Sequence, residues 1–148
     1  MSDVSNKVTR LNGVNTDTNN VQHDAYVIDT NALGITSAGS YTVAVIPAGN
    51  VVRGGTMVAL SSITPGGTVV IQAKPVSGGA AVSLHSQASA AVISAGYAKS
   101  FVNGGGVCYV DGQPTNIDVV VGTSAITSGG KLFLDIESVP VGKYLTNG

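Results

Sequence analysis

The stretch SYTVAVIPAGNVVRGG, Ser40–Gly55, contains an alternating run, a corner and the start of a second apolar run. In the first run the alternation predicts two sets of side chains on opposite faces: Tyr41, Val43 and Val45 on one, and Thr42, Ala44 and Ile46 on the other. Pro47 cannot donate to a strand ladder, and Gly49 permits a sharp reversal of the chain. The stretch therefore predicts two short β-strands joined by a tight corner.

Short apolar runs of this kind recur along the chain, separated by Gly, Pro, Ser and Asn. Nine runs are candidate strands: Ala25–Asp29, Ser40–Ile46, Val51–Ser61, Thr68–Lys74, Ala81–His85, Tyr97–Asn103, Val107–Val110, Thr115–Val121 and Lys131–Val139. The pattern is typical of an all-β, antiparallel sandwich or barrel. One segment, Gln87–Ala95, is rich in alanine, and both a short helix and a further strand fit it.

Three of the candidate strands indicate which side chains form the core. In the last strand Leu132, Leu134 and Ile136 alternate with Phe133, Asp135 and Glu137, so one face is buried and the other meets solvent or a partner. The same logic gives two further inward sets, Ile117, Val119 and Val121 with Asp118 outward, and Val69, Ile71 and Ala73 with Gln72 and Lys74 outward. Because many side chains are small, we expect two sheets that approach closely over a thin core.

The first residues differ from the rest of the chain. From Ser2 to Gln22 the sequence is polar and aperiodic, and its apolar residues are too scattered to bury a face. We therefore expect an extended N-terminal arm, residues 1–22, followed by a single β-sandwich domain, residues 23–148. A chain of 148 residues suits one domain.

Charged residues make up only 10% of the chain, and the net charge is -1. No charged residue falls between Asp29 and Arg53, between Arg53 and Lys74, or between Lys74 and Lys99. Glycines, prolines and many hydroxyl side chains interrupt these gaps, which argues against membrane-spanning helices. The low positive charge and the 5% of aromatic residues argue against nucleic-acid binding. A surface with so little charge is poorly protected against association.

The sequence offers few residues for catalysis. His23 beside Asp24 provides two parts of a hydrolytic triad, but a solvated histidine explains it better, and no Gly-x-Ser-x-Gly elbow presents a nucleophile. His85 is expected on the outward face of its strand. Asp135 and Glu137 share a face that could suit a cation, although a solvated face is the simpler interpretation. We expect no catalytic, cofactor or metal site and no enzymatic activity.

Cys108 is the single cysteine of the chain, so no disulfide can form within one copy. It also lacks the companion cysteines of the common zinc patterns. We therefore expect synthesis in a reducing cytoplasm.

The strand-corner-strand stretch Tyr41–Gly55 and the closing stretch Asp118–Leu134 together resemble the small jelly-roll cement, or decoration, proteins of tailed-bacteriophage heads. The resemblance spans roughly residues 40–139 and concerns structural motifs. It implies a jelly-roll sandwich that forms a homo-oligomer, a dimer or trimer, on the capsid exterior of the virion. There it would clamp neighbouring subunits of the major capsid protein after synthesis in the bacterial host cytoplasm.

We further hypothesise that the N-terminal arm lies along the capsid or a neighbouring copy. Its candidate contact residues are Lys7, Arg10, Asn12 and Asn15.

An alternative is a carbohydrate- or host-binding sandwich module of a virion fibre. Sugar sites commonly use aromatic platforms, and Tyr26, Tyr97 and Tyr109 are the candidates, although tyrosines of a core or interface explain them better.

Overall fold

The computed structural model describes residues 2–4, 8–12, 22–76, 81–87, 93–102, 112–122 and 124–140. All regular structure in these residues is β-strand, which confirms the all-β prediction. The strands are β1 (Ser2–Asp3), β2 (Thr9–Asn12), β3 (Gln22–Asp29), β4 (Gly39–Ile46), β5 (Asn50–Ala59), β6 (Val69–Pro75), β7 (Val82–Gln87), β8 (Ala98–Val102), β9 (Thr115–Val121) and β10 (Lys131–Pro140).

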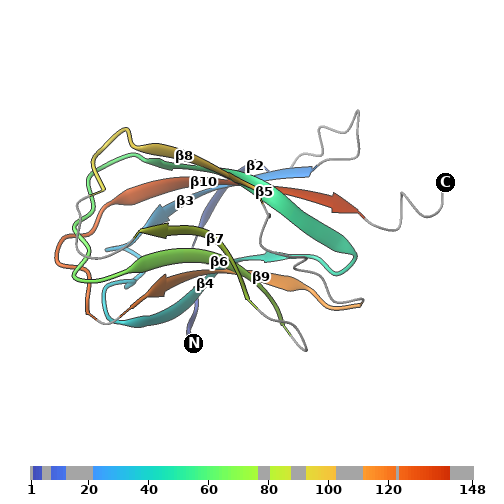
Figure 1. Cartoon of the computed structure of the whole chain (residues 1–148), viewed down its shortest axis with the longest axis horizontal. Helices are drawn as coiled ribbons and strands as arrows, with labels where there is room; N and C mark the ends of the chain where they lie inside the picture. Colours follow the sequence, from blue (N-terminus) through green and yellow to red (C-terminus); the bar gives the residue numbers. More distant parts are fainter. Residues whose placement is uncertain are drawn as a thin grey trace.

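The strands form two five-stranded sheets that lie one above the other (Figure 1). Sheet A has the order β1-β4-β9-β6-β7, and sheet B has the order β2-β3-β10-β5-β8. Among the strands described, β1 runs parallel to β4, and every other pairing is antiparallel. The predicted architecture of two antiparallel sheets is therefore confirmed.

Eight of the nine candidate strands overlap strands of the structure, and the ninth, Val107–Val110, lies outside the described residues. In the ambiguous segment Gln87–Ala95, Gln87 ends β7, residues 88–92 lie outside the described part, and Ile93 forms an isolated bridge with Ile63. The predicted arm contributes β1 and β2, which pair with β4 and β3 at one edge of each sheet.

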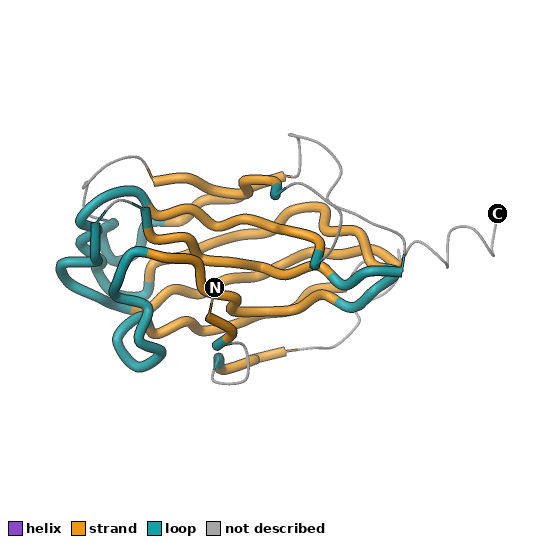
Figure 2. Tube along the Cα trace, turned by 90° about the horizontal axis from the view of Figure 1, so that it is seen from below, coloured by secondary structure: helices purple, strands orange, loops and turns teal. Residues whose placement is uncertain are grey.

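The chain crosses repeatedly between the two sheets. The corner at residues 47–49 leads from β4 in sheet A to β5 in sheet B, and residues 122–130 lead from β9 in sheet A to β10 in sheet B. Most of the described loops gather at one end of the sandwich (Figure 2). They are bonded to one another there, since Thr64 forms a bridge with Ser128 and the Ile126 amide donates to the Thr36 carbonyl at 2.7 Å.

The core lies between the sheets and is built from the residues that alternation assigned to it. Ile71, Ile117, Val119, Leu134 and Ile136 are almost completely buried, whereas their neighbours Val70, Phe133 and Asp135 are only half-buried. The predicted inward faces of β6, β9 and β10 are thus confirmed. Apart from these, the largest fully buried side chains are Ile28, Ile35, Ile46, Met57, Ile63, Leu132, Val43 and Val52.

The strict alternation predicted for Ser40–Ile46 is wrong. A β-bulge interrupts β4, because Thr42 pairs with Asp118 but Ala44 pairs with Ile117, which leaves Val43 as the additional residue. The bulge changes the phase of the strand, so Ala44 is buried whereas Val45 is 42% exposed. A single inserted residue therefore reverses the predicted faces of the second half of the strand.

Asp118 occupies the outward position predicted for it, but it is 0% exposed. Its register partners on the two neighbouring strands are Thr42 and Gln72. The Thr42 hydroxyl donates to Oδ1 at 2.8 Å, and the Gln72 amide donates to Oδ2 at 3.4 Å. The predicted outward direction is therefore confirmed, but Asp118 is buried on that side, where Thr42 and Gln72 supply its hydrogen bonds.

Candidate interaction surface

Four apolar residues form a row across the outer face of sheet B. The register pairs Val27 with Phe133, Phe133 with Val58, and Val58 with Ala98. Directly paired residues share a face, and the chain neighbours of Val27, Phe133 and Val58 are buried, so these side chains lie on the side away from the core. We call Val27, Phe133, Val58 and Ala98 the apolar row.

Leu60 and Lys131 lie beside the apolar row at the loop end of the sandwich. The Leu60 amide donates to the Lys131 carbonyl at 2.8 Å, and Leu60 is 51% exposed. Lys131 is exposed and pairs with Asp29, whose Oδ1 accepts the amide protons of Asn31 and Ala32 at 3.1 and 3.2 Å. The Asp29 carboxylate thus stabilises the turn that follows β3, and Lys131 lies on the loop side of the apolar row.

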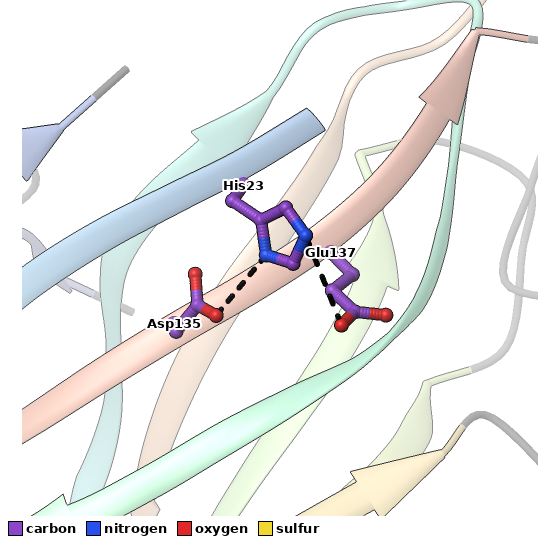
Figure 3. A network of polar contacts seen from close by, with 3 residues as sticks. All are labelled: His23, Asp135 and Glu137. Carbon is purple, nitrogen blue, oxygen red and sulfur yellow. Dashed lines mark hydrogen bonds and ion pairs between the residues drawn. The ribbon is translucent and has the colours of Figure 1, made fainter. Parts of the chain in front are cut away.

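On the opposite side of the apolar row, the imidazole of His23 lies between the carboxylates of Asp135 and Glu137 (Figure 3). Nδ1 is 3.2 Å from Oδ2 of Asp135, and Nε2 is 3.9 Å from Oε1 of Glu137. The side chains are 33%, 24% and 37% exposed, respectively. The cross-strand register explains the arrangement, because His23 pairs directly with Glu137 and lies diagonal to Asp135.

This cluster differs from the predicted combination of His23 with Asp24. Asp24 is buried and pairs with Ile136 of the core, so successive residues of β3 place the two side chains on opposite faces. Nδ1 of His23 instead lies within hydrogen-bond distance of Asp135, whereas Nε2 lies 3.9 Å from Glu137, beyond that distance. No group of three or more metal-ligating side chains suited to a metal ion occurs in the described part of the chain.

The candidate contact residues of the arm are only partly placed. Lys7 and Asn15 lie outside the described residues. Arg10 and Asn12 lie in β2, where their register partners are Tyr26 and Ala25 of β3. These two residues therefore belong to the edge of sheet B.

His85 lies in β7, where the register pairs it with Ile71 of β6, next to a register shift between Ile71 and Gln72. Its outward orientation stays a prediction.

The tyrosines considered for sugar binding occupy different places. Tyr26 is buried in the core, whereas Tyr97 is 38% exposed next to the last residues of β5. Tyr109 lies outside the described residues. Tyr26 thus offers no open platform for a sugar.

The sequence pattern identified Phe133, Asp135 and Glu137 as residues of one face, but it did not identify the apolar row. Val27 and Val58 come from other strands, so only the strand register brings them beside Phe133. No helix in the described part of the chain is long and apolar enough to cross a membrane. Comparisons with protein-family models, with curated proteins and with solved structures find no match for this chain.

Proposed function

We propose that this protein is a structural component of a virion, which binds the outside of a bacteriophage capsid as a homo-oligomer and cements neighbouring major capsid subunits. The observation that carries the proposal is the outer face of sheet B, where the apolar row lies between Lys131 and the cluster of Asp135 and Glu137. A broad sheet face of this composition is suited to a protein partner, because apolar contact and flanking charges occur together.

The order of the strands supports the jelly-roll interpretation. From β3 to β10 the chain visits the sheets in the order B, A, B, A, A, B, A, B, and β9 and β10 are inserted between earlier strands. A double-sheet arrangement of eight strands in this order supports a jelly roll. Both stretches that resemble the cement proteins contain a crossing from sheet A to sheet B.

The low charge of the chain supports a cementing mechanism. Only 10% of the residues are charged, so a surface of this protein can be covered without removing many ions from water. An oligomer that contacts several capsid subunits at once adds its individually weak contacts and gains avidity. Such a clamp would resist the separation of neighbouring subunits.

The test is sedimentation of the purified chain with capsids of the same virus that were assembled without it. We expect the chain to pellet with these capsids and to saturate at a fixed number of copies per capsid. If the sedimented chain carries a tag, an excess of untagged chain should displace it from the same sites. A chain that stays in the supernatant at all concentrations would contradict the proposal. A parallel glycan-binding assay examines the alternative, and saturable sugar binding without capsid binding would favour a host-recognition module.

A further inference from the structure

The outer face of sheet B offers an apolar surface to a second copy. It presents the apolar row on four neighbouring strands. Lys131 and Asp135 lie on either side of this row along β10, so the face combines apolar contact with charges of opposite sign.

The charges on this face are arranged symmetrically about Phe133. Lys131, Phe133 and Asp135 alternate along β10, so all three lie on the outer face. Lys131 and Asp135 are each two residues from Phe133, about 7 Å along the strand. If a second β10 lies antiparallel across the first, with the two Phe133 residues in contact, each Lys131 faces the Asp135 of the other copy.

We propose that two copies of this chain pair through the outer faces of sheet B. The two-fold axis lies between the two faces, passes near Phe133 and runs perpendicular to β10. The interface is self-complementary, because the same operation that brings the apolar rows together also brings Lys131 of each copy to Asp135 of the other. The inference rests on the homo-oligomer of the proposed function and specifies its surface and its symmetry.

The remaining acidic groups of the face are compatible with this arrangement. The axis places Asp29 of one copy across from Ala25 of the other, because both pair with β10 at the positions of Lys131 and Asp135. Asp29 also has its carboxylate engaged by two amide protons of its own turn. Glu137 lies beyond Asp135 and near His23, outside the central contact.

Sheet A provides the matched comparison. The middle row of its outer face is polar, because Thr42 and Gln72 both donate hydrogen bonds to Asp118. Val70 of β6 is half-buried and occupies a place in sheet A like that of Val58 in sheet B, on the strand next to an edge strand. Substitutions at these two valines therefore test the two faces with the same change of side chain.

The first experiment measures the mass of the full chain by sedimentation equilibrium over a range of concentrations. We expect a species of twice the 14.7 kDa of one chain, its loss in Val58→Lys, and its retention in Val70→Lys. Circular dichroism of both variants establishes that each is folded. A wild-type chain that remains monomeric, or a folded Val58→Lys variant that still pairs, would overturn the inference.

The second experiment tests the symmetry by exchanging the charges. Lys131→Glu places like charges together at two symmetric points, so we expect the dissociation constant to rise by about tenfold or more. Asp135→Lys combined with Lys131→Glu reverses both partners, and it should restore most of the affinity. If the double variant pairs no better than the single variant, the two-fold arrangement is wrong.

Capsid binding by the same variants separates the inference from the proposed function. A wild-type chain that pairs as described but does not bind capsids would support the inference and contradict the cementing role. A chain that binds capsids while Val58→Lys leaves its oligomer unchanged would contradict the inference and leave the cementing role supported.

Discussion

Thr42 donates its hydroxyl proton to Asp118 across 2.8 Å, and both residues are buried although they occupy outward positions of sheet A. The contact joins β4 to β9, the central strand of that sheet. Removing one partner of a buried hydrogen bond costs more than the net value of the bond, because the remaining polar group loses water without compensation.

Thr42→Val is therefore expected to lower the free energy of unfolding by about 1–3 kcal/mol, measured by chemical denaturation. The matched control is Thr115→Val in β9, since Thr115 is buried and its hydroxyl has no hydrogen-bond partner among the described residues. This control should be neutral or stabilising, because valine removes a polar atom that is buried without a partner. Equal losses in the two variants would contradict the assigned role of the Thr42 hydroxyl.

Neighbouring residues of β6 test the assignment of its two faces. Ile71 is buried in the core, so Ile71→Ala should destabilise the protein by about 2–5 kcal/mol. Val70 lies on the outer face and is half-buried, so Val70→Ala should cost only about 1 kcal/mol. The comparison is made by urea denaturation, and a larger loss at Val70 than at Ile71 would reverse the faces of sheet A.

We expect any larger residue at Gly130 to lower the stability of the protein. Its amide donates to the Thr30 hydroxyl at 2.9 Å and its carbonyl accepts the Thr30 amide at 3.0 Å, so the backbone at the start of β10 is fixed. A Cβ added at Gly130 would lie 2.5 Å from the Ser62 carbonyl oxygen. Gly130→Ala should therefore lower the stability by about 1–3 kcal/mol or more, measured as a shift of the denaturation midpoint.

Gly34→Ala is the control for that prediction. Gly34 has a φ of +73° but open space around it, so alanine there adds backbone strain without a clash. We expect a cost of about 1 kcal/mol for this strain. A Gly130→Ala variant that is no less stable than Gly34→Ala would argue against the close approach of Ser62.

The ion pair of His23 with Asp135 should contribute little to stability. The two side chains are 33% and 24% exposed, and partly solvated pairs of this kind are weakened by water and by salt. A double-mutant cycle with His23→Ala and Asp135→Ala should give a coupling energy of about 0.2–1 kcal/mol at low salt. The corresponding cycle with Glu137, at 3.9 Å, should give less, and a larger value for Glu137 would contradict the geometry of the cluster.

The regular strands could be predicted because one face of each is buried. In β9 and β10 the apolar residues recur at every second position without interruption, and the predicted inward sets agree with the structure. In β4 the same reasoning was wrong from Ala44 onward, because the bulge depends on how the strand pairs with β9. Local alternation carries no information about an inserted residue whose effect lies in the ladder with another strand.

The candidate surface could be predicted only in part for a similar reason. Asp135 and Glu137 belong to one strand, so their common face follows from their spacing. His23 is more than one hundred residues away from Asp135 in the chain, and the sequence suggested its neighbour Asp24 as its partner. Only the strand register places His23 beside the two carboxylates. The cluster and the apolar row are products of strand order, which the spacing of residues within one strand does not specify.

The positions of β9 and β10 have a consequence for the growing polypeptide on the ribosome. These strands follow all the other described strands in the chain, yet β9 joins β4 to β6 and β10 joins β3 to β5. Until they emerge from the exit tunnel, each sheet is divided into two halves that share no ladder. A truncated translation product that lacks residues 115–140 would therefore have neither layer closed, and only the finished chain could display Phe133 among its neighbours on an intact sheet.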